Sequence, residues 1–101
     1  MDEEALLEKL AKRLPSPSGR APWASVASLM DALERIGRSG TSVLVKIDGG
    51  RSSDAVYTVV ISGGRLGNDF FRKDGADLSA LLREGIQFFL AHAGAGTPER
   101  P

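Results

Sequence analysis

Two neighbouring segments of the chain are apolar on both of their sides, and this constrains the fold more than any other feature. Side chains alternate between the two faces of a strand, and residues 41–48 and 55–62 carry apolar side chains in both alternate sets. One set is Val43, Val45 and Ile47 together with Tyr57, Val59 and Ile61. The turn-rich residues 48–54 between the segments predict a hairpin. The sequence therefore predicts a small antiparallel sheet with two apolar faces.

Helical periodicity flanks these strands on both sides. Apolar residues recur at helical spacing from Trp23 to Gly37, and again after Asp77, which is a suitable N-cap for a helix that runs to about residue 93. A short third strand is expected at residues 69–73. The predicted class is α+β, a two-layer sandwich of a three-stranded antiparallel sheet and packed helices, in the order α-α-β-β-β-α. Gly85, on the apolar arc of the last helix, indicates either a close approach of backbone to a neighbouring element or a tolerated irregularity of the helix.

Leu6, Leu10 and Leu14 form a narrow apolar stripe at the start of the chain. The segment 15–22, Pro-Ser-Pro-Ser-Gly-Arg-Ala-Pro, separates this stripe from the other predicted elements. We therefore divide the chain into an amphipathic helical arm (1–14), a Pro/Ser linker (15–22), a core domain (23–93) and a flexible tail (94–101). With 101 residues, the chain is long enough for one domain.

Composition excludes several classes of protein. There is no Cys, so neither a disulfide framework nor a thiolate metal site is expected. No apolar run approaches the roughly 18 residues of a membrane span, so no membrane contact is expected. The acidic start, Met1-Asp2-Glu3-Glu4, is unlike a secretory signal, and a cytoplasmic location is expected.

The second alternate set of the two strands comprises Leu44, Val56, Thr58 and Val60, and no predicted element obviously covers it. Phe70 and Phe71 are adjacent, so one of the two should join this set. Three covers are open: the arm of the same chain, a second copy of the chain that contributes its face or its arm, and a different partner. We expect a homodimer or a contact with another protein, through the following residues: Leu6, Leu10, Leu14, Leu44, Val56, Thr58, Val60, Phe70 and Phe71.

No residue pattern predicts catalysis, a metal or a cofactor. His92 is the only histidine, and the sequence places no nucleophile or orienting carboxylate beside it. Asp48 and Asp54 bracket a loop that lacks the alternating acids of a calcium site. The segment Ser62-Gly63-Gly64-Arg65-Leu66-Gly67 invites a phosphate-loop interpretation. It lacks the phosphate-loop motifs and should precede a strand, so a hairpin loop with positive φ is the favoured prediction.

The order α-β-β-β-α over residues 23–92 resembles the double-stranded-RNA-binding domain. In that family the last helix begins with basic residues that contact phosphates. The corresponding stretch here, Asp74-Gly75-Ala76-Asp77, is acidic, so the resemblance implies the outline of the fold and not the activity. The passage from Lys73 to Leu78, followed by Leu81-Leu82, is similar to the sheet-to-helix patterning of the HicB-like antitoxin fold.

Residues 41–73 carry a modest basic excess, with five bases against three acids. This excess is smaller than the basic stripe that nucleic-acid binding usually shows, so a nucleic-acid partner is not expected. Possible anion contacts are Arg51, Arg65, Arg72 and Lys73. The function we expect is a non-enzymatic interaction domain that self-associates through the second face of its sheet, with the arm helping to cover it. The alternative is an anion-binding or nucleic-acid-binding module that uses these four cations.

Overall fold

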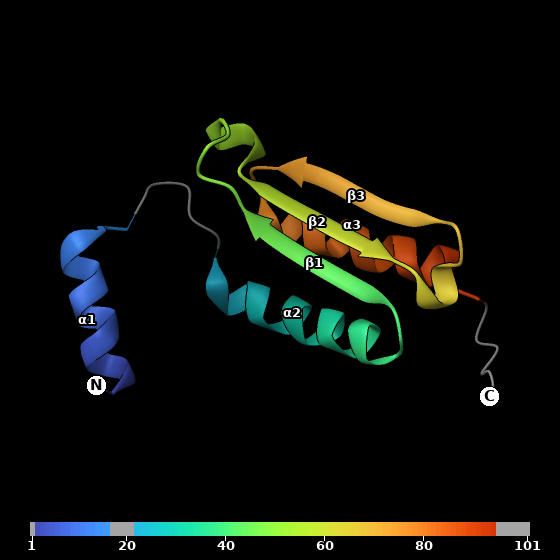
Figure 1. Ribbon diagram of the computed structural model, residues 1–101, viewed down its shortest axis with the longest axis horizontal. Coiled ribbons are helices and arrows are strands. Elements are labelled where there is room, and N and C mark those ends of the chain that lie inside the picture. Colours follow the sequence, from blue (N-terminus) through green and yellow to red (C-terminus); the bar gives the residue numbers. More distant parts are fainter. Residues whose placement is uncertain (1, 17–21, 95–101) are drawn as a thin grey trace.

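The computed structural model describes residues 2–16 and 22–94 of the chain (Figure 1). The helices are α1 (Glu3–Arg13), α2 (Trp23–Arg38) and α3 (Leu78–His92), and the strands are β1 (Ser42–Ile47), β2 (Tyr57–Ser62) and β3 (Phe70–Gly75). Two single-turn 3-10 helices, η1 (Ser53–Ala55) and η2 (Gly64–Leu66), lie in the loops between strands. The predicted α+β class and element order are confirmed. The predicted linker and tail fall mostly on residues 17–21 and 95–101, which lie outside the described residues.

The ends of the helices follow from local side-chain chemistry. The Asp2 carboxylate accepts a hydrogen bond from the Ala5 amide at 2.8 Å and so caps α1. Glu3 and Glu4 in the first turn of α1, and basic residues in its last turn, complement the helix dipole. Asp77 caps α3 in the predicted way, accepting from the Ala80 amide at 3.1 Å.

The three strands form an antiparallel sheet in the order β1-β2-β3, with Leu44 opposite Val60 and Val60 opposite Arg72. Figure 1 shows α3 behind β2 and β3 and α2 running along β1, below it in this view, and α2 also packs against α3. Both helices therefore cover the same face. The core between the two layers comprises Val26, Leu33, Ile36, Tyr57, Val59, Ile61, Leu66, Leu78, Leu81 and Leu82.

The glycine-rich segment between β2 and β3 is a connecting loop, as predicted. Gly63, Gly64 and Gly67 all have positive φ, between 55° and 80°, a region that side chains other than hydrogen disfavour. A Cβ at Gly64 would lie 2.7 Å from the Gly40 carbonyl oxygen. The path of the loop itself thus requires these glycines.

The prediction that Gly85 marks a close approach is confirmed. A Cβ at Gly85 would lie 2.9 Å from Ile61 Cδ1 and 3.3 Å from the ring of Phe71. Ile61 is fully buried, so it has little room to move aside. Glycine at this position lets the backbone of α3 approach the sheet more closely than any other residue would allow.

Helical spacing predicts that Trp23, Met30 and Leu90 lie on the apolar, core-facing arcs of α2 and α3, and this prediction is wrong. Leu90 is 75% exposed, because it lies about 140° around α3 from Gly85 at 100° per residue. Trp23 and Met30 are also exposed, at 43% and 39%. They occupy the flank of α2, whereas Leu33 and Val26 occupy the side that faces the core.

None of the helices in residues 2–16 and 22–94 combines the length and apolarity that crossing a bilayer requires.

The contact at Gly85 gives a first prediction. Gly85→Ala should lower the free energy of unfolding by about 1 kcal/mol, because the added methyl group overpacks the contact by more than the gain in helix propensity. Gly37→Ala is the matched control, since a Cβ at Gly37 meets only Val43 Cγ2 at 4.0 Å. The control should raise stability by up to about 1 kcal/mol. Urea unfolding followed by circular dichroism would measure both, and a rise of the same size in both variants would contradict the packing described here.

Candidate functional site

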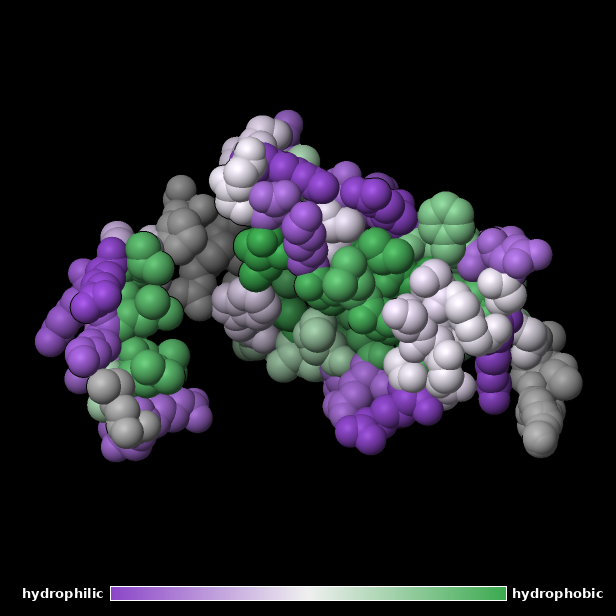
Figure 2. All heavy atoms as spheres, in the orientation of Figure 1, coloured by the Kyte–Doolittle hydropathy of each residue, from purple (hydrophilic) through white to green (hydrophobic). Residues whose placement is uncertain are grey.

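The face of the sheet that no helix covers, which we call the open face, is apolar over one part only. By alternation it carries nine outward-facing positions, three from each strand. Leu44 and Phe70 are 53% and 62% exposed, and Val60 lies between their strands, half-buried. Figure 2 looks onto this face and shows a green, apolar area at its centre, with purple, charged side chains near its upper edge. The predicted apolar face is thus confined to Leu44, Val60 and Phe70.

The end of the open face that lies nearest to Arg51 is covered by a polar network centred on Thr58. Arg51 Nη1 donates to Thr58 Oγ1 at 2.9 Å, and the Thr58 hydroxyl donates to Asp74 Oδ1 at 2.5 Å. Arg51 also forms ion pairs with Asp74 at 3.0 Å and with Asp48 at 3.4 Å. Lys46 pairs with Asp48 at 3.4 Å. Thr58 is only 3% exposed as a result, and the Arg51 side chain acts as its cover.

The network lowers the pKa of each of its two carboxylates. The hydrogen bond from Thr58, and then that from Arg51, lowers the pKa of Asp74 below its ordinary value of 3.8. The Gly50 amide, which donates to Asp48 at 2.9 Å, is the main cause that lowers the pKa of Asp48, and Lys46 and Arg51 add to it. Both carboxylates are thereby held in the charged form that the surrounding cations favour.

Two of the six interaction residues predicted from the strands do not lie on the open face. Val56 precedes β2, has helical backbone angles (φ −67°, ψ −30°) and packs partly against the core. Alternation within a strand therefore does not apply to it. Phe71 faces the helices, where its ring centroid lies 5.7 Å from that of Phe88. The prediction that one of the two phenylalanines joins the open face is confirmed, and that residue is Phe70.

The four cations proposed as anion contacts are not brought together. Arg51 and Arg72 lie on the open face and pair with Asp74. Lys73 reaches the other way and binds Glu84 of α3 at 2.6 Å. Arg65 lies in η2, between β2 and β3, at the opposite end of β2 from Arg51 (Figure 1). Three of the four cations are therefore neutralised by carboxylates, and the set has no common centre.

The arm predicted from the leucine stripe is α1, and its apolar side lies uncovered. No residue of α1 is buried. Leu6, Leu7, Leu10 and Leu14 are each between 52% and 66% exposed. Figure 1 shows α1 standing apart from the sheet, and Figure 2 shows the leucines in green along one side of it. The structure therefore does not place the arm of this chain on its own open face.

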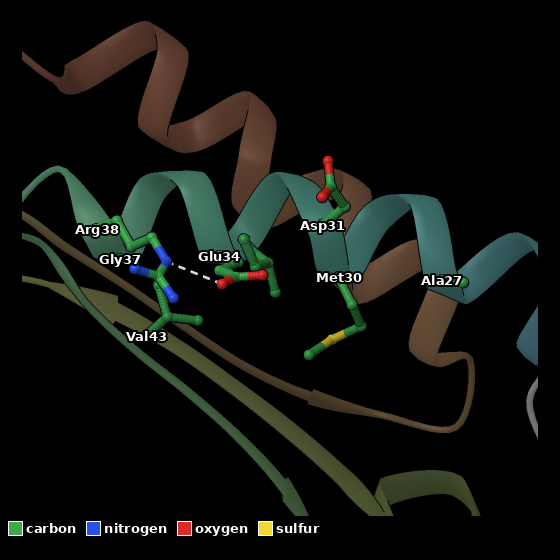
Figure 3. Close-up of a pocket in the computed structure, with 8 residues that line it drawn as sticks. Ala27, Met30, Asp31, Glu34, Gly37, Arg38 and Val43 are labelled. Atoms are coloured by element: carbon green, nitrogen blue, oxygen red, sulfur yellow. Dashed lines mark hydrogen bonds and ion pairs between the residues drawn. The ribbon is translucent and has the colours of Figure 1, made fainter.

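An apolar groove between α2 and β1 is a feature that the sequence did not reveal. Its volume is about 760 Å³. Ala27, Met30, Leu33 and Gly37 of α2, with Val43 of β1, supply its apolar lining. Asp31, Glu34 and Arg38 supply the polar lining, and Arg38 Nε binds Glu34 at 2.8 Å (Figure 3). We call this feature the α2–β1 groove.

The His92 ring belongs to a local stack at the end of α3. It lies on the ring of Phe88 with a centroid distance of 4.0 Å, and Nδ1 donates to the Phe88 carbonyl at 3.0 Å. In the part of the chain that the structure describes, no group of three or more His, Asp or Glu residues is arranged to hold a metal ion. The chemistry available on these surfaces is apolar contact and ion pairing.

The residues that sequence reasoning missed left only weak signals. Thr58 is a polar residue within an otherwise apolar strand, which indicated that something must satisfy its hydroxyl. Nothing in the sequence identified Arg51 and Asp74 as its partners, because they lie seven residues before it and sixteen after it. The sequence features that indicate the groove are Ala27 and Gly37, two small residues on the same flank of α2 as Met30.

Comparison of the chain with protein-family models, with curated proteins and with solved structures found no match.

The polar network gives a second prediction, on pH dependence. Folding lowers the pKa of Asp74. The ionised Asp74 carboxylate therefore stabilises the folded chain above about pH 4, and this contribution is lost as the pH falls through the lowered pKa. Asp74→Asn should therefore be less stable than the unmodified chain near neutral pH, and the difference should shrink towards zero in strong acid. Urea unfolding at a series of pH values would measure this.

Asp31→Asn is the control for this experiment. It removes an ion pair with Arg35 in which both side chains are more than 60% exposed, and such pairs contribute little. Its effect should be small at every pH. A stability difference for Asp74→Asn that persists unchanged in acid would contradict the role given to the Asp74 carboxylate.

Proposed function

We propose that this chain is a non-enzymatic interaction domain that self-associates, with the open face as part of the contact. The observation that carries the proposal is the apolar patch of Leu44, Val60 and Phe70, which no helix covers. Contiguous exposed apolar side chains bordered by polar ones are typical of protein interfaces. The neighbouring charged groups form ion pairs with one another, which favours a contact surface over a catalytic site.

A second copy of the chain is the partner that this surface fits best. In a two-fold symmetric contact the same patch meets itself, so it must be compatible with its own charges. The open face satisfies this condition because Lys46 and Arg72 stand beside Asp48 and Asp74. Apolar Leu44 and Phe70 can then meet their counterparts without bringing like charges together.

Anion binding is not favoured by the geometry. A phosphate would have to displace carboxylates that already hold Arg51, Arg72 and Lys73. The four candidate cations also lack a common centre, so they would not act together on one ligand.

Charge placed in the apolar patch should break the association. We expect the unmodified chain to form dimers at micromolar concentration in analytical ultracentrifugation. Phe70→Glu combined with Leu44→Glu should weaken dimerisation at least tenfold, which corresponds to about 1.4 kcal/mol, because the contact would bury unpaired carboxylates. Both side chains are more than half exposed in the single chain, so the variant should still fold.

Leu90→Glu is the matched control. It replaces an equally large apolar side chain that is 75% exposed on α3, away from the open face, and it should leave the dimer unchanged. A strictly monomeric unmodified chain, or equal weakening by the control, would refute self-association through the open face.

A further inference from the structure

Within residues 2–16 and 22–94, the leucine side of α1 and the α2–β1 groove are two further apolar surfaces that nothing covers. We propose that α1 of a second copy docks in the α2–β1 groove, antiparallel to α2. This inference rests on the proposed self-association and specifies a second part of the same contact. In a two-fold dimer each chain would give one α1 and receive one.

The groove and the helix match in length and in character. The α2 residues that line the groove run from Ala27 to Arg38, which corresponds to about 18 Å of helix. The 11 residues of α1 span about 16 Å. One side of α1 carries the exposed leucines, and the groove offers Met30, which is 39% exposed, together with the small Ala27 and Gly37. An amphipathic helix in an apolar groove is a recurrent mode of recognition.

The charges select the antiparallel orientation. The first turn of α1 is acidic, with Glu3 and Glu4, and its last turn is basic. The last turn of α2 carries Arg35 and Arg38. Antiparallel docking opposes the two helix dipoles and sets Glu3 and Glu4 near Arg38, the arginine that lines the groove and that pairs with Glu34. Parallel docking would instead align the two dipoles and set the basic end of α1 near Arg38.

The size of the contact points to a second copy as the donor of α1. Stable interfaces involve about 20–30 residues on each side, and the open face offers only nine outward positions. The 11 residues of α1 and the eight that line the groove bring the contact into that range. In the structure, moreover, the α1 of the same chain stands apart from the sheet (Figure 1).

Introduced cysteines can test this arrangement, since the chain has none of its own. Aligning Glu3 with Arg38 and Leu14 with Ala27 places Ala11 opposite Met30. Ala11→Cys and Met30→Cys are prepared as separate chains, one of them carrying a tag of different mass. The two chains are mixed and oxidised, and the products are separated by non-reducing electrophoresis. We expect a disulfide-linked heterodimer of the two chains.

Lys12→Cys, mixed with Met30→Cys, is the control. Lys12 lies on the polar side of α1, about 180° from the centre of the leucine stripe, and should give at least fivefold less heterodimer. If the unmodified chain is dimeric but the Ala11 and Lys12 variants cross-link to Met30→Cys equally, docking of α1 in the groove is wrong, and self-association through the open face still stands.

The double variant Ala11→Cys with Met30→Cys separates exchange between chains from docking within one chain. Exchange predicts a covalent dimer, which migrates at twice the mass of the chain. A covalently closed monomer, formed by a chain that sediments as a monomer, would show α1 in its own groove and would overturn both this inference and the proposed function.

Discussion

The close approach of α3 to the sheet at Gly85 is the contact on which the rest of the structure depends. Ile61 and Phe71 lie so near to this glycine that a methyl group would collide with them. This approach lets α3 pack directly against β2 and β3, while α2 packs along β1 on the same side of the sheet. With both helices on one face, the chain has no element left in its core to cover the other face.

The uncovered face is divided into two regions by a single polar residue. Thr58 occupies a position that an apolar residue would otherwise fill, and its hydroxyl links Arg51 to Asp74. The guanidinium of Arg51 then shields this part of β2 from water, and the aliphatic part of such a side chain can cover apolar surface. Only Leu44, Val60 and Phe70 remain as the apolar part of this face. The apolar region is therefore smaller than the strand pattern indicated, and better defined.

Much of the fold could be predicted from the sequence, because its signals are local. Apolar runs bounded by turn-rich segments predicted β1 and β2 to within two residues, and Asp77 marked the start of α3 through its own side chain. Gly85 could be interpreted because a glycine within an apolar helical arc lowers helix stability, and close packing against a neighbour offsets that cost. The candidate site was harder to predict, because it depends on contacts between distant segments. The conformation just before β2 turned Val56 back towards the core, and no alternation rule anticipates such a change. To predict that Arg51 covers Thr58, one would have to know the path of the loop that carries Arg51. To predict the groove, one would have to know the angular position of Met30 relative to β1.

The two free edges of the sheet differ in the number of charged side chains that they carry. β3 carries Arg72, Lys73 and Asp74 along one edge, whereas β1 carries a single charged residue, Lys46, among apolar ones. Exposed apolar edges invite further strands, and charged side chains discourage them. The β1 edge is therefore the vulnerable one, and it runs beside the α2–β1 groove. A helix bound in that groove would lie beside the β1 edge and would hinder stacked or fibrous assemblies from adding strands there.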